Sequence, residues 1–574
     1  MIDKRSVAQV LEQIAAFMQL KGESAFRVRA FTNAARVVNG FPEELDTAIA
    51  NGSLGAARGI GPVTHKIVSE LMTTGRSSLL EELRGQIPPG LVEMLEIPGL
   101  GVAKIRQIHE VLGIDSIPEL EAAARDGRLS RLPRFGPKTA DNVLKGIGFL
   151  RQTSGLRLSH HAADEANGRR MALERIPGVR QAIVAGEVRR RSEVVRDIVL
   201  VLVAEVAPAE IFDLLRKLPG VHEFAGQDER RVTLRFAGGS SAQVMVTTPV
   251  NLGAVLVQAT GSEEHLAQLA QRAGSRGFTL NGAALWKGSG FVPTPDEAAF
   301  YRALGLDEIP PELREGRGEI EAAEHHRIPR LIETCDLQGL LHCHTTYSDG
   351  SCTVRELAIT SRDAGYTYVG VTDHSQAAAY AGGLIPSELL RQGAEIDEVN
   401  ASIEGIRVLK GIEADILADG QVDYDENVLA GLDFVIASVH SRFNMNEEEM
   451  TARILTALDN PYVSILGHPT GRLLLSRNPF PVDLDAVFTR AAERGVAMEI
   501  NADPHRLDLD WRLVREARSR GVAISIGADA HSVATLRHVE SGIGIARKAW
   551  LTRDDVLNAL PVEEFTARMQ RVRS

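Results

Sequence analysis

Histidine and aspartate residues that could bind metal recur at fixed spacing in the C-terminal part of this chain. His342 and His344 lie two positions apart in the run LLHCH, and Asp529 and His531 repeat that spacing in AISIGADAH. Side chains at i and i+2 of a strand point to the same side, so each pair presents two ligand groups together. Cys343, between the two histidines, should face the other way, towards a helical layer.

Five more candidates lie between these pairs: Asp349, His374, Glu413, His440 and His468. A mononuclear site uses about three or four protein ligands, so nine candidates indicate two or three ions, with Glu413 as a shared bridge. The mixture of imidazole and carboxylate favours Zn, Mn or Fe over Mg or Ca. One such histidine alone is more typical of a surface or core position, so the joint pattern carries the hypothesis.

The elements that must position these residues are seven short apolar runs that alternate with helical patterns after Asp336. The runs are LLHCH, YVGVTDH, RVLKGIE, DFVIASVH, VSILGH, VAMEIN and AISIGADAH. Strands that are apolar throughout and separated by helices predict a parallel sheet covered on both sides, as in a βα barrel. Active sites of such barrels lie at the C-terminal strand ends, where the candidates cluster.

These motifs resemble the PHP (polymerase and histidinol phosphatase) family over about residues 336–570, since HCH, YSDG, TDH, SVH, GHP and ADAH are all present. The resemblance implies a distorted seven-stranded (β/α) barrel with a trinuclear Mn or Zn site that hydrolyses phosphoesters, and all nine candidates as its ligands. We expect His342, His344, Glu413 and Asp529 to hold the catalytic cations. Adjacent cations can activate a bridging water and bind a phosphate oxygen, so no separate protein base is needed.

Three residues that follow the ligand motifs have two interpretations. Arg442 follows SVH, Arg472 follows GHPT and His505 follows EINADP. Each fits a contact to a substrate phosphate, and each fits equally well an ordinary solvated loop residue.

Short amphipathic helices separated by Gly-hydrophobic-Gly turns fill the first 150 residues or so. The turns read GIGP, GLGV and RFGP, the last with Arg134 in place of its first glycine. Such a turn directs backbone N–H groups and a helix N-terminus at a phosphate without reading the base, although glycine also ends helices routinely. The first two copies resemble helix-hairpin-helix motifs. The expected DNA-binding residues are Gly59, Gly61, Lys66, Gly99, Gly101, Lys104, Gly136 and Lys138.

The order of these parts resembles bacterial family X DNA polymerases with a C-terminal PHP domain, over essentially the whole chain. Strand patterns such as VVRDIVLVLVAEV and RRVTLRF indicate an α+β domain between the helices and the barrel. The expected multidomain layout is a helical N-terminal domain with the first hairpin (1–85), a helical fingers-like domain with two more (86–178), a nucleotidyltransferase palm/thumb-like domain (179–303), a linker (304–336) and a PHP phosphoesterase domain (337–574).

The nucleotidyltransferase pattern of that family is only partly kept. The family has Gly-Ser and an arginine pair, two aspartates two residues apart on a strand, and a third aspartate on a later strand, which together hold two Mg ions. Val199 stands at the second aspartate, Gln243 at the third and Glu187 at the serine. The residual site comprises Gly186, Arg189, Arg190, Asp197, Thr260, Gly261 and Ser262.

We therefore expect this domain to hold DNA but to polymerise poorly or not at all, without a well-formed Mg or Mn site. Glu193 or Glu205 could replace the missing carboxylates after a shift in register. The family's Schiff-base lysine position holds Ile67, with Lys66 beside it, so lyase activity is not expected.

The amino-acid composition limits the classes of protein to which this chain can belong. A chain of 574 residues with 44% apolar and 24% charged residues is an ordinary multidomain globular protein, which excludes fibrous and mainly disordered classes. The net charge of −12 argues against coating polyanions with the whole surface, and three cysteines without a CxxC pattern fit a reducing compartment. With no long apolar run and no signal-like N-terminus, we expect a cytoplasmic protein without a membrane partner.

The favoured function is a DNA-repair protein, for example in base excision repair, whose PHP domain acts as a metal-dependent 3′–5′ exonuclease on gapped, nicked or 3′-end substrates. The use of dNTPs stays open. One alternative is an active gap-filling DNA polymerase with PHP proofreading. Another is a DNA-binding scaffold whose PHP domain hydrolyses small phosphomonoesters.

Overall fold

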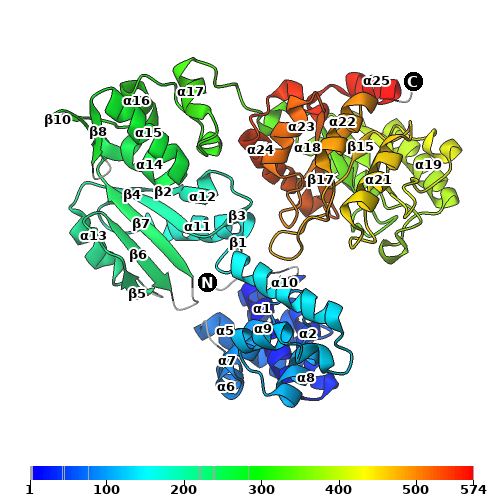
Figure 1. Cartoon of the computed structure of the whole chain (residues 1–574), viewed down its shortest axis with the longest axis horizontal. Helices are drawn as coiled ribbons and strands as arrows, with labels where there is room; N and C mark the ends of the chain where they lie inside the picture. Colours follow the sequence, from blue (N-terminus) through cyan, green and yellow to red (C-terminus); the bar gives the residue numbers. More distant parts are fainter. Residues whose placement is uncertain are drawn as a thin grey trace. The chain divides into compact units, whose positions relative to one another are not determined.

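The computed structural model describes residues 4–572 except 42, 44, 75–76, 219–220, 237–239 and 282–283 (Figure 1). The chain divides into two compact units, Met1–Gly155 and Leu156–Ser574. Among the described helices, none combines the length and apolar character that a membrane crossing requires.

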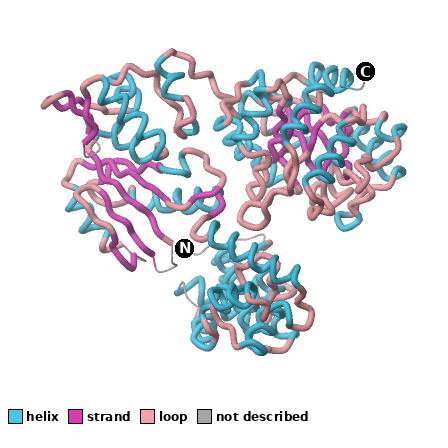
Figure 2. Tube along the Cα trace, viewed as in Figure 1, coloured by secondary structure: helices cyan, strands magenta, loops and turns pink. Residues whose placement is uncertain are grey.

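The first unit contains helices and turns only, within its described residues (Figure 2). Its amphipathic helices bury one shared apolar cluster that includes Leu11, Val68 and Ile105, which confirms the predicted helical region. The elements are α1 (Lys4–Leu20), α2 (Ala25–Asn39), α3 (Leu45–Ala50), α4 (Ser53–Ala56), α5 (Pro62–Thr74), α6 (Ser78–Gln86), α7 (Pro89–Met94), α8 (Val102–Leu112), α9 (Ile117–Arg125), η1 (Leu129–Arg131) and α10 (Pro137–Thr153).

The second unit begins with a five-stranded sheet of order β2-β4-β7-β6-β5, in which β4 and β7 are parallel. The elements of this part are β1 (Arg157–Leu158), α11 (Ser159–Leu173), β2 (Val179–Ala185), α12 (Gly186–Arg189), β3 (Val194–Val195), β4 (Ile198–Ala204), α13 (Pro208–Leu215), β5 (Val221–Ala225), β6 (Arg231–Phe236) and β7 (Ser241–Thr247). A smaller subdomain follows with η2 (Pro249–Asn251), α14 (Leu252–Thr260), α15 (Glu263–Ser275), the antiparallel strands β8 (Phe278–Asn281), β9 (Ala284–Lys287) and β10 (Gly290–Val292), and α16 (Glu297–Ala303).

Residues 304–336, expected as a linker without a core, are folded instead. They form η3 (Pro311–Leu313), α17 (Glu319–Glu324) and η4 (Thr334–Asp336). Leu306, Ile309 and Leu313 pack into the apolar cluster of the smaller subdomain. The charged residues that suggested a solvated segment are partly internal, since the Glu319 carboxylate lies 2.6 Å from Nδ1 of the buried His265.

A closed barrel of seven parallel strands occupies the C-terminal part, as predicted. Each strand ends in a loop at one rim and returns through helical segments to the other. The strands are β11 (Gly339–Cys343), β12 (Tyr368–Val371), β13 (Arg407–Asp415), β14 (Phe434–Ser438), β15 (Ile465–Leu466), β16 (Ala497–Asn501) and β17 (Ile524–Ala530). The helical segments are α18 (Val354–Asp363), η5 (Ala379–Ala381), α19 (Pro386–Ser402), α20 (Glu426–Leu429), α21 (Glu447–Leu458), α22 (Leu484–Arg494), α23 (Trp511–Ser519), η6 (Val533–His538), α24 (Val539–Lys548), η7 (Arg553–Asp555), η8 (Leu557–Ala559) and α25 (Val562–Val572).

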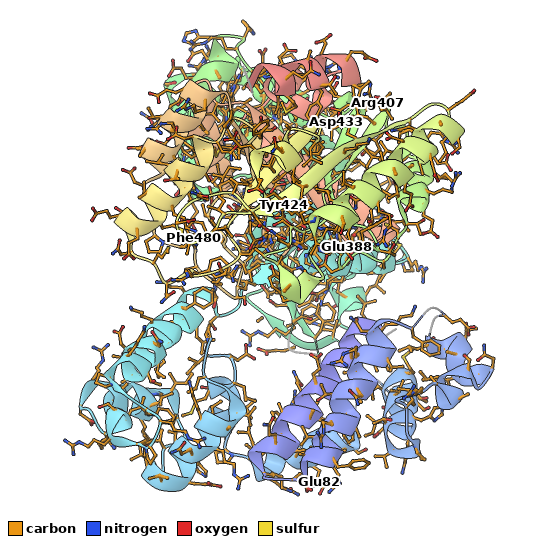
Figure 3. The ribbon with its side chains drawn as sticks, turned by 90° about the vertical axis from the view of Figure 1, so that its right-hand side faces the viewer. Glu82, Glu388, Arg407, Tyr424, Asp433 and Phe480 are labelled. Atoms are coloured by element: carbon orange, nitrogen blue, oxygen red, sulfur yellow. The ribbon has the colours of Figure 1, made fainter. Side chains whose placement is uncertain are left out.

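The two ends of the barrel differ in chemistry. Near the strand starts, Tyr368 and Phe434 form an apolar plug with Phe565 of α25. Figure 3 labels Arg407 and Asp433 at these strand starts, away from Tyr424 and Phe480, which lie on loops that follow strands. Apolar side chains thus close this end of the barrel, and the nine candidate ligands lie at the C-terminal strand ends.

Candidate metal centre

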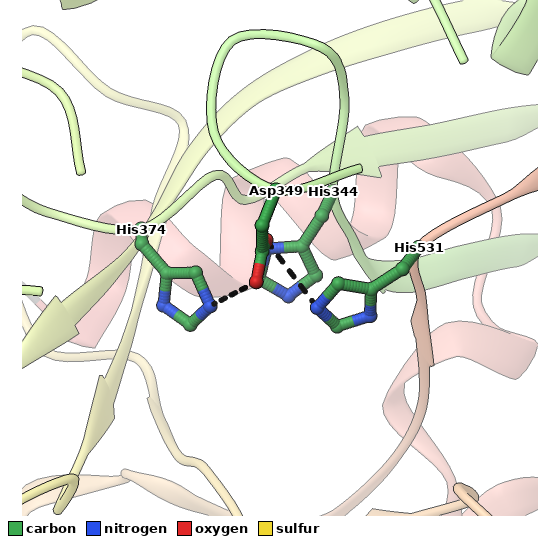
Figure 4. Close-up of side chains that lie close together, drawn as sticks. All are labelled: His344, Asp349, His374 and His531. Atoms are coloured by element: carbon green, nitrogen blue, oxygen red, sulfur yellow. Dashed lines mark ion pairs between the residues drawn. The ribbon is translucent and has the colours of Figure 1, made fainter. Parts of the chain in front are cut away.

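The nine candidate ligands all come from the C-terminal ends of the strands or from the loops that follow them. His342 is in β11, Glu413 in β13 and Asp529 in β17, whereas the other six lie just beyond a strand. Eight of them form three overlapping groups with ligand atoms within 4.8 Å of one another. The groups are His344, Asp349, His374 and His531 (Figure 4); His342, His344 and Asp529; and His374, Glu413 and His440.

Glu413 lies at the middle of the cluster and is 1% exposed. Its Oε1 is 2.9 Å from Nε2 of His468, the ninth candidate, and 3.2 Å from Nε2 of His440. Its Oε2 is 3.0 Å from Nδ1 of His374. Burial favours the neutral acid, but His440 and the other imidazoles outweigh it and hold the pKa of Glu413 well below its usual range.

Several buried imidazole nitrogens at this rim make no hydrogen bond of normal geometry, although some lie close to a carboxylate oxygen. They are Nε2 of His342, Nδ1 and Nε2 of His344, Nδ1 of His374 and Nδ1 of His468. A buried polar atom without a partner normally destabilises the folded protein by about 1–3 kcal/mol. The presence of several such atoms at one point therefore needs an explanation. Cation coordination is such a cause, and the imidazole and carboxylate set fits divalent ions such as Mn or Zn.

Three of the candidates hold the backbone in the left-handed region, with φ of 59° at His342, 47° at Asp529 and 25° at His468. For a residue other than glycine this costs on the order of 1–3 kcal/mol, and such strain clusters at functional sites. The pairing register of β11 shifts between Leu341 and Cys343, so simple strand alternation is broken at His342. Cys343 nevertheless packs in the outer apolar cluster, as expected.

Carboxylates behind the candidates orient their imidazoles. Glu499 Oε1 is 2.6 Å from Nδ1 of His342, and Asp415 Oδ1 is 2.7 Å from Nδ1 of His440. This leaves the Nε2 atoms of both rings facing Glu413. A Cβ at Gly527 would lie 1.8 Å from Glu499 Oε1, so only glycine leaves room for that carboxylate.

The sequence interpretation missed Glu499 and Asp415, although a signal was present. Asp415 lies two positions after Glu413 on the same strand, and VAMEIN was the one apolar run without an assigned ligand. Asp373 was missed as well. It accepts hydrogen bonds from Thr345 and Gln392 and so fixes the loop before Asp349.

The residues expected as phosphate contacts lie in different surroundings. Arg442 is exposed. Arg472 is 9% exposed and paired with Glu193 and Asp510 at 3.1 Å each, so its role is internal and neither interpretation of it was correct. His505 is exposed beside His160, with ring centroids 5.2 Å apart.

Two residues that the sequence did not single out adjoin the cluster. Arg506 is half-buried and its Nε lies 3.6 Å from Oδ2 of Asp529. Tyr380 has its ring centroid 6.2 Å from that of His374. Partial burial, together with the nearby carboxylates of Asp415 and Glu413, raises the pKa of Tyr380 to about 12, so its phenol is neutral at physiological pH.

The seven residues expected as a residual transferase site lie around the paired strands β4 and β7, and none of them is in either strand. Val199 and Gln243 are direct partners in that pairing, so the two substituted positions are neighbours in space. Asp197 precedes β4, and Glu187 accepts a hydrogen bond from the backbone N–H of Arg196 at 2.6 Å. The carboxylates considered as replacements lie elsewhere: Glu193 pairs with Arg472, and Glu205 follows the far end of β4.

The arginine pair of this site is engaged by protein carboxylates. Arg189 makes two bonds to Glu297, at 2.9 and 2.5 Å. Arg190 contacts Glu315 at 3.1 Å and the carbonyl of Thr260 at 2.7 Å. Ser262 caps α15 through the backbone N–H of His265, with Gly261 just before it.

The three expected hairpins share one backbone turn. Gly59, Gly99 and Arg134 have φ of 102°, 79° and 69°, and the next residue in each copy donates its N–H to a carbonyl three residues earlier. Gly61, Gly101 and Gly136 then precede α5, α8 and α10. Lys66 and Lys138 lie in α5 and α10, and Lys104 Nζ is 3.4 Å from the carbonyl of Gly99.

Four protein-family descriptions match the chain. They are "Helix-hairpin-helix domain" at residues 2–77, "SAM-like Helix-hairpin-helix tandem" at 91–148, "DNA polymerase beta thumb" at 255–315 and "PHP domain" at 341–502. The chain is 35% identical over 573 residues to the DNA polymerase/3'-5' exonuclease PolX of Bacillus subtilis, covering 99% of both chains. A probable phosphatase of Acetivibrio thermocellus is 35% identical over 165 residues, which is 28% of this chain and 63% of that protein.

Proposed function

The chain belongs to the family X DNA polymerases that carry a C-terminal PHP domain, and from this premise we propose that its main activity is metal-dependent 3′–5′ removal of nucleotides from DNA ends during repair. The full-length relative in Bacillus subtilis is named a DNA polymerase and 3'-5' exonuclease. The observation that carries the proposal is the buried Glu413 surrounded by imidazoles, several of which have a buried nitrogen without a hydrogen bond.

Divalent ions bound at this rim would supply a Lewis acid and a water activated at neutral pH. The chain's own residues do the positioning. Glu499 and Asp415 hold the outer nitrogens of His342 and His440, so that their Nε2 atoms face Glu413. Arg506, beside Asp529, is suited to bind a non-bridging phosphate oxygen of the scissile diester. The hairpins of the first unit would hold the sugar-phosphate backbone without reading sequence.

A gapped duplex labelled at the 5′ end of its primer tests this function. With Mn and no dNTPs, the wild-type protein should shorten the primer, and the His342→Ala/His344→Ala variant should not. His325→Ala, which removes an exposed histidine outside the barrel, serves as the matched control. Equal degradation by the wild type and the double variant would reject the assignment.

For the transferase-like domain we propose weak or absent nucleotide addition. Val199 and Gln243 supply no negative charge for metal binding, and Arg189 and Arg190 are already paired with carboxylates. In the same assay with dNTPs, the primer should not lengthen, and Asp197→Ala should change nothing. Extension that Asp197→Ala abolishes would instead support a gap-filling polymerase with PHP proofreading.

The relatives named probable phosphatases favour one second candidate for the same metal site, hydrolysis of small phosphomonoesters. In that case the wild-type protein would release phosphate from a small monoester, whereas the labelled primer would keep its length under every condition.

A further inference from the structure

An ordered loop between β12 and α19 borders the candidate metal centre. The backbone N–H of Leu384 donates to the carbonyl of His374 at 2.9 Å, and the N–H of Ala377 donates to Asp423 at 2.8 Å. Ala378 and Leu384 are fully buried, and a Cβ at Gly383 would lie 1.9 Å from the Ser375 carbonyl oxygen. The loop is therefore packed and hydrogen-bonded, not a solvated excursion.

This fixed loop presents Tyr380 to solvent. The side chain is 73% exposed, and among the described residues of the barrel domain, 337–572, Tyr380 is the one exposed residue of the types Phe, Tyr and Trp. Other tyrosines near the rim are anchored: Tyr347 donates to Glu395 at 2.8 Å and Tyr424 (Figure 3) donates to the Leu384 carbonyl. A single exposed ring is common on protein surfaces, but this one is held on a packed loop next to a candidate metal ligand, so it is available to a ligand bound at the metals.

The position of the Tyr380 ring indicates which kind of ligand would cover it. Its centroid is 6.2 Å from that of His374, a candidate metal ligand, so a substrate whose phosphate lies at the metals would have its next chemical group near Tyr380. In a nucleotide that group is the sugar with its base, and bases stack on exposed aromatic rings without regard to sequence. A small phosphomonoester without a base gains nothing from this ring.

We propose that Tyr380 is the stacking platform for the terminal base of a DNA strand whose phosphodiester lies at the metal centre. This rests on the nuclease function proposed above and makes Tyr380 a specificity residue of that site. It explains how a site built for phosphoesters in general favours a DNA end over a small phosphate ester.

The test compares two 5′-labelled single-stranded oligonucleotides, one with a normal 3′-terminal base and one with an abasic tetrahydrofuran in its place. On the normal end, Tyr380→Ala should raise KM about 5- to 150-fold, the range that one base–aromatic stack supplies, with a smaller effect on kcat. On the abasic end, it should change KM less than about twofold. Tyr380→Phe should behave as wild type, as should Leu390→Ala, a control that removes a side chain 78% exposed in the same domain.

A second readout does not need turnover. With 2-aminopurine at the 3′ end and a phosphorothioate linkage that slows cleavage, binding should quench the fluorescence in wild type but not in Tyr380→Ala. An unchanged KM, or equal losses on normal and abasic ends, would overturn the role of Tyr380. Quenching without any shortening of unmodified DNA would support base stacking on Tyr380 and reject the nuclease function. A failure of the stacking proposal can therefore be told apart from a failure of the proposed nuclease function.

Discussion

At the scale of single residues, the account depends on how the carboxylates around Glu413 orient the imidazoles. Glu499 uses both oxygens: Oε1 contacts Nδ1 of His342, and Oε2 accepts the backbone N–H of His468 at 2.7 Å. One buried carboxylate thus fixes two candidate ligands, both of which have a left-handed backbone. Such outer partners set metal affinity almost as strongly as the ligands themselves.

Replacing Glu499 by Gln should therefore lower metal affinity by about 10- to 100-fold, although the side chain keeps its size. The amide cannot accept from both donors, since its NH₂ group would face either the His468 N–H or the protonated His342 nitrogen. Competition of Mn or Zn with a chelator measures the effect. Glu493→Gln, with a side chain 63% exposed on α22, is the control, and an unchanged affinity for Glu499→Gln would contradict the positioning role.

Much of this site could be predicted from the sequence, because strand periodicity and the C-terminal rim of parallel strands determine where a ligand after each apolar run must lie. The roles of Arg472 and Arg506 could not. Arg472 follows a ligand motif, but only the packed fold shows that Glu193, nearly 280 residues earlier, pairs with it. Arg506 follows the one run without an assigned ligand, and only the fold shows that it lies beside Asp529. Pairings between distant segments leave no local pattern.

At the scale of elements, the hairpins show one turn built twice with glycine and once without it. Arg134 adopts the left-handed conformation that glycine adopts in the other copies, which costs a residue with a Cβ about 1–2 kcal/mol. The third copy therefore has the complete backbone turn although it lacks the first glycine.

The variants Gly99→Ala and Gly101→Ala separate the effect of the backbone conformation from the effect of the space available to a Cβ atom. A Cβ would meet nothing within 4 Å at either position, but φ is +79° at Gly99 and −70° at Gly101. Gly99→Ala should destabilise the hairpin by about 1 kcal/mol, whereas Gly101→Ala should stay within about 0.5 kcal/mol of wild type. Hydrogen exchange of the buried α8 amides measures both; equal effects would show that the left-handed turn is not what requires Gly99.

At the scale of the whole molecule, the barrel and the transferase-like part of the second unit share buried charges. Lys548 of α24 is 2% exposed, contacts Glu315 and donates to the Arg190 carbonyl at 3.1 Å. Arg547 pairs with Glu312 at 2.8 Å. The partners on the transferase side are Arg190 and two glutamates of segment 304–336, so this part of the chain is joined to the barrel by buried charged contacts.

Lys548→Met should destabilise this unit by on the order of 3 kcal/mol, because it leaves the charge of Glu315 less compensated in a buried place. Lys548 Nζ lies 5.2 Å from the Trp511 ring, so tryptophan fluorescence during urea unfolding is a direct probe. Lys410→Met breaks a more exposed pair with Asp397 and should cost less than about 1 kcal/mol. Similar losses in the two variants would show that the Lys548 contact does not couple the parts.

The packing of segment 304–336 is the part of the fold that the sequence analysis missed. Its proline, glycine and alternating charges are typical of a linker, and its helical stretch is too short for a periodic signal. The buried Arg314 and Glu319 are satisfied by Glu297 and His265 from other elements, and such pairing appears only once the chain is folded.

An anomalous-scattering map from crystals of the protein loaded with Mn tests directly whether the nine candidates form a metal centre. Two or three peaks are expected inside the cage around Glu413, each in contact with imidazole nitrogens and carboxylate oxygens of the nine candidates. Crystals of a protein that still shortens DNA but shows no peak in this cage would show that cleavage does not depend on this centre.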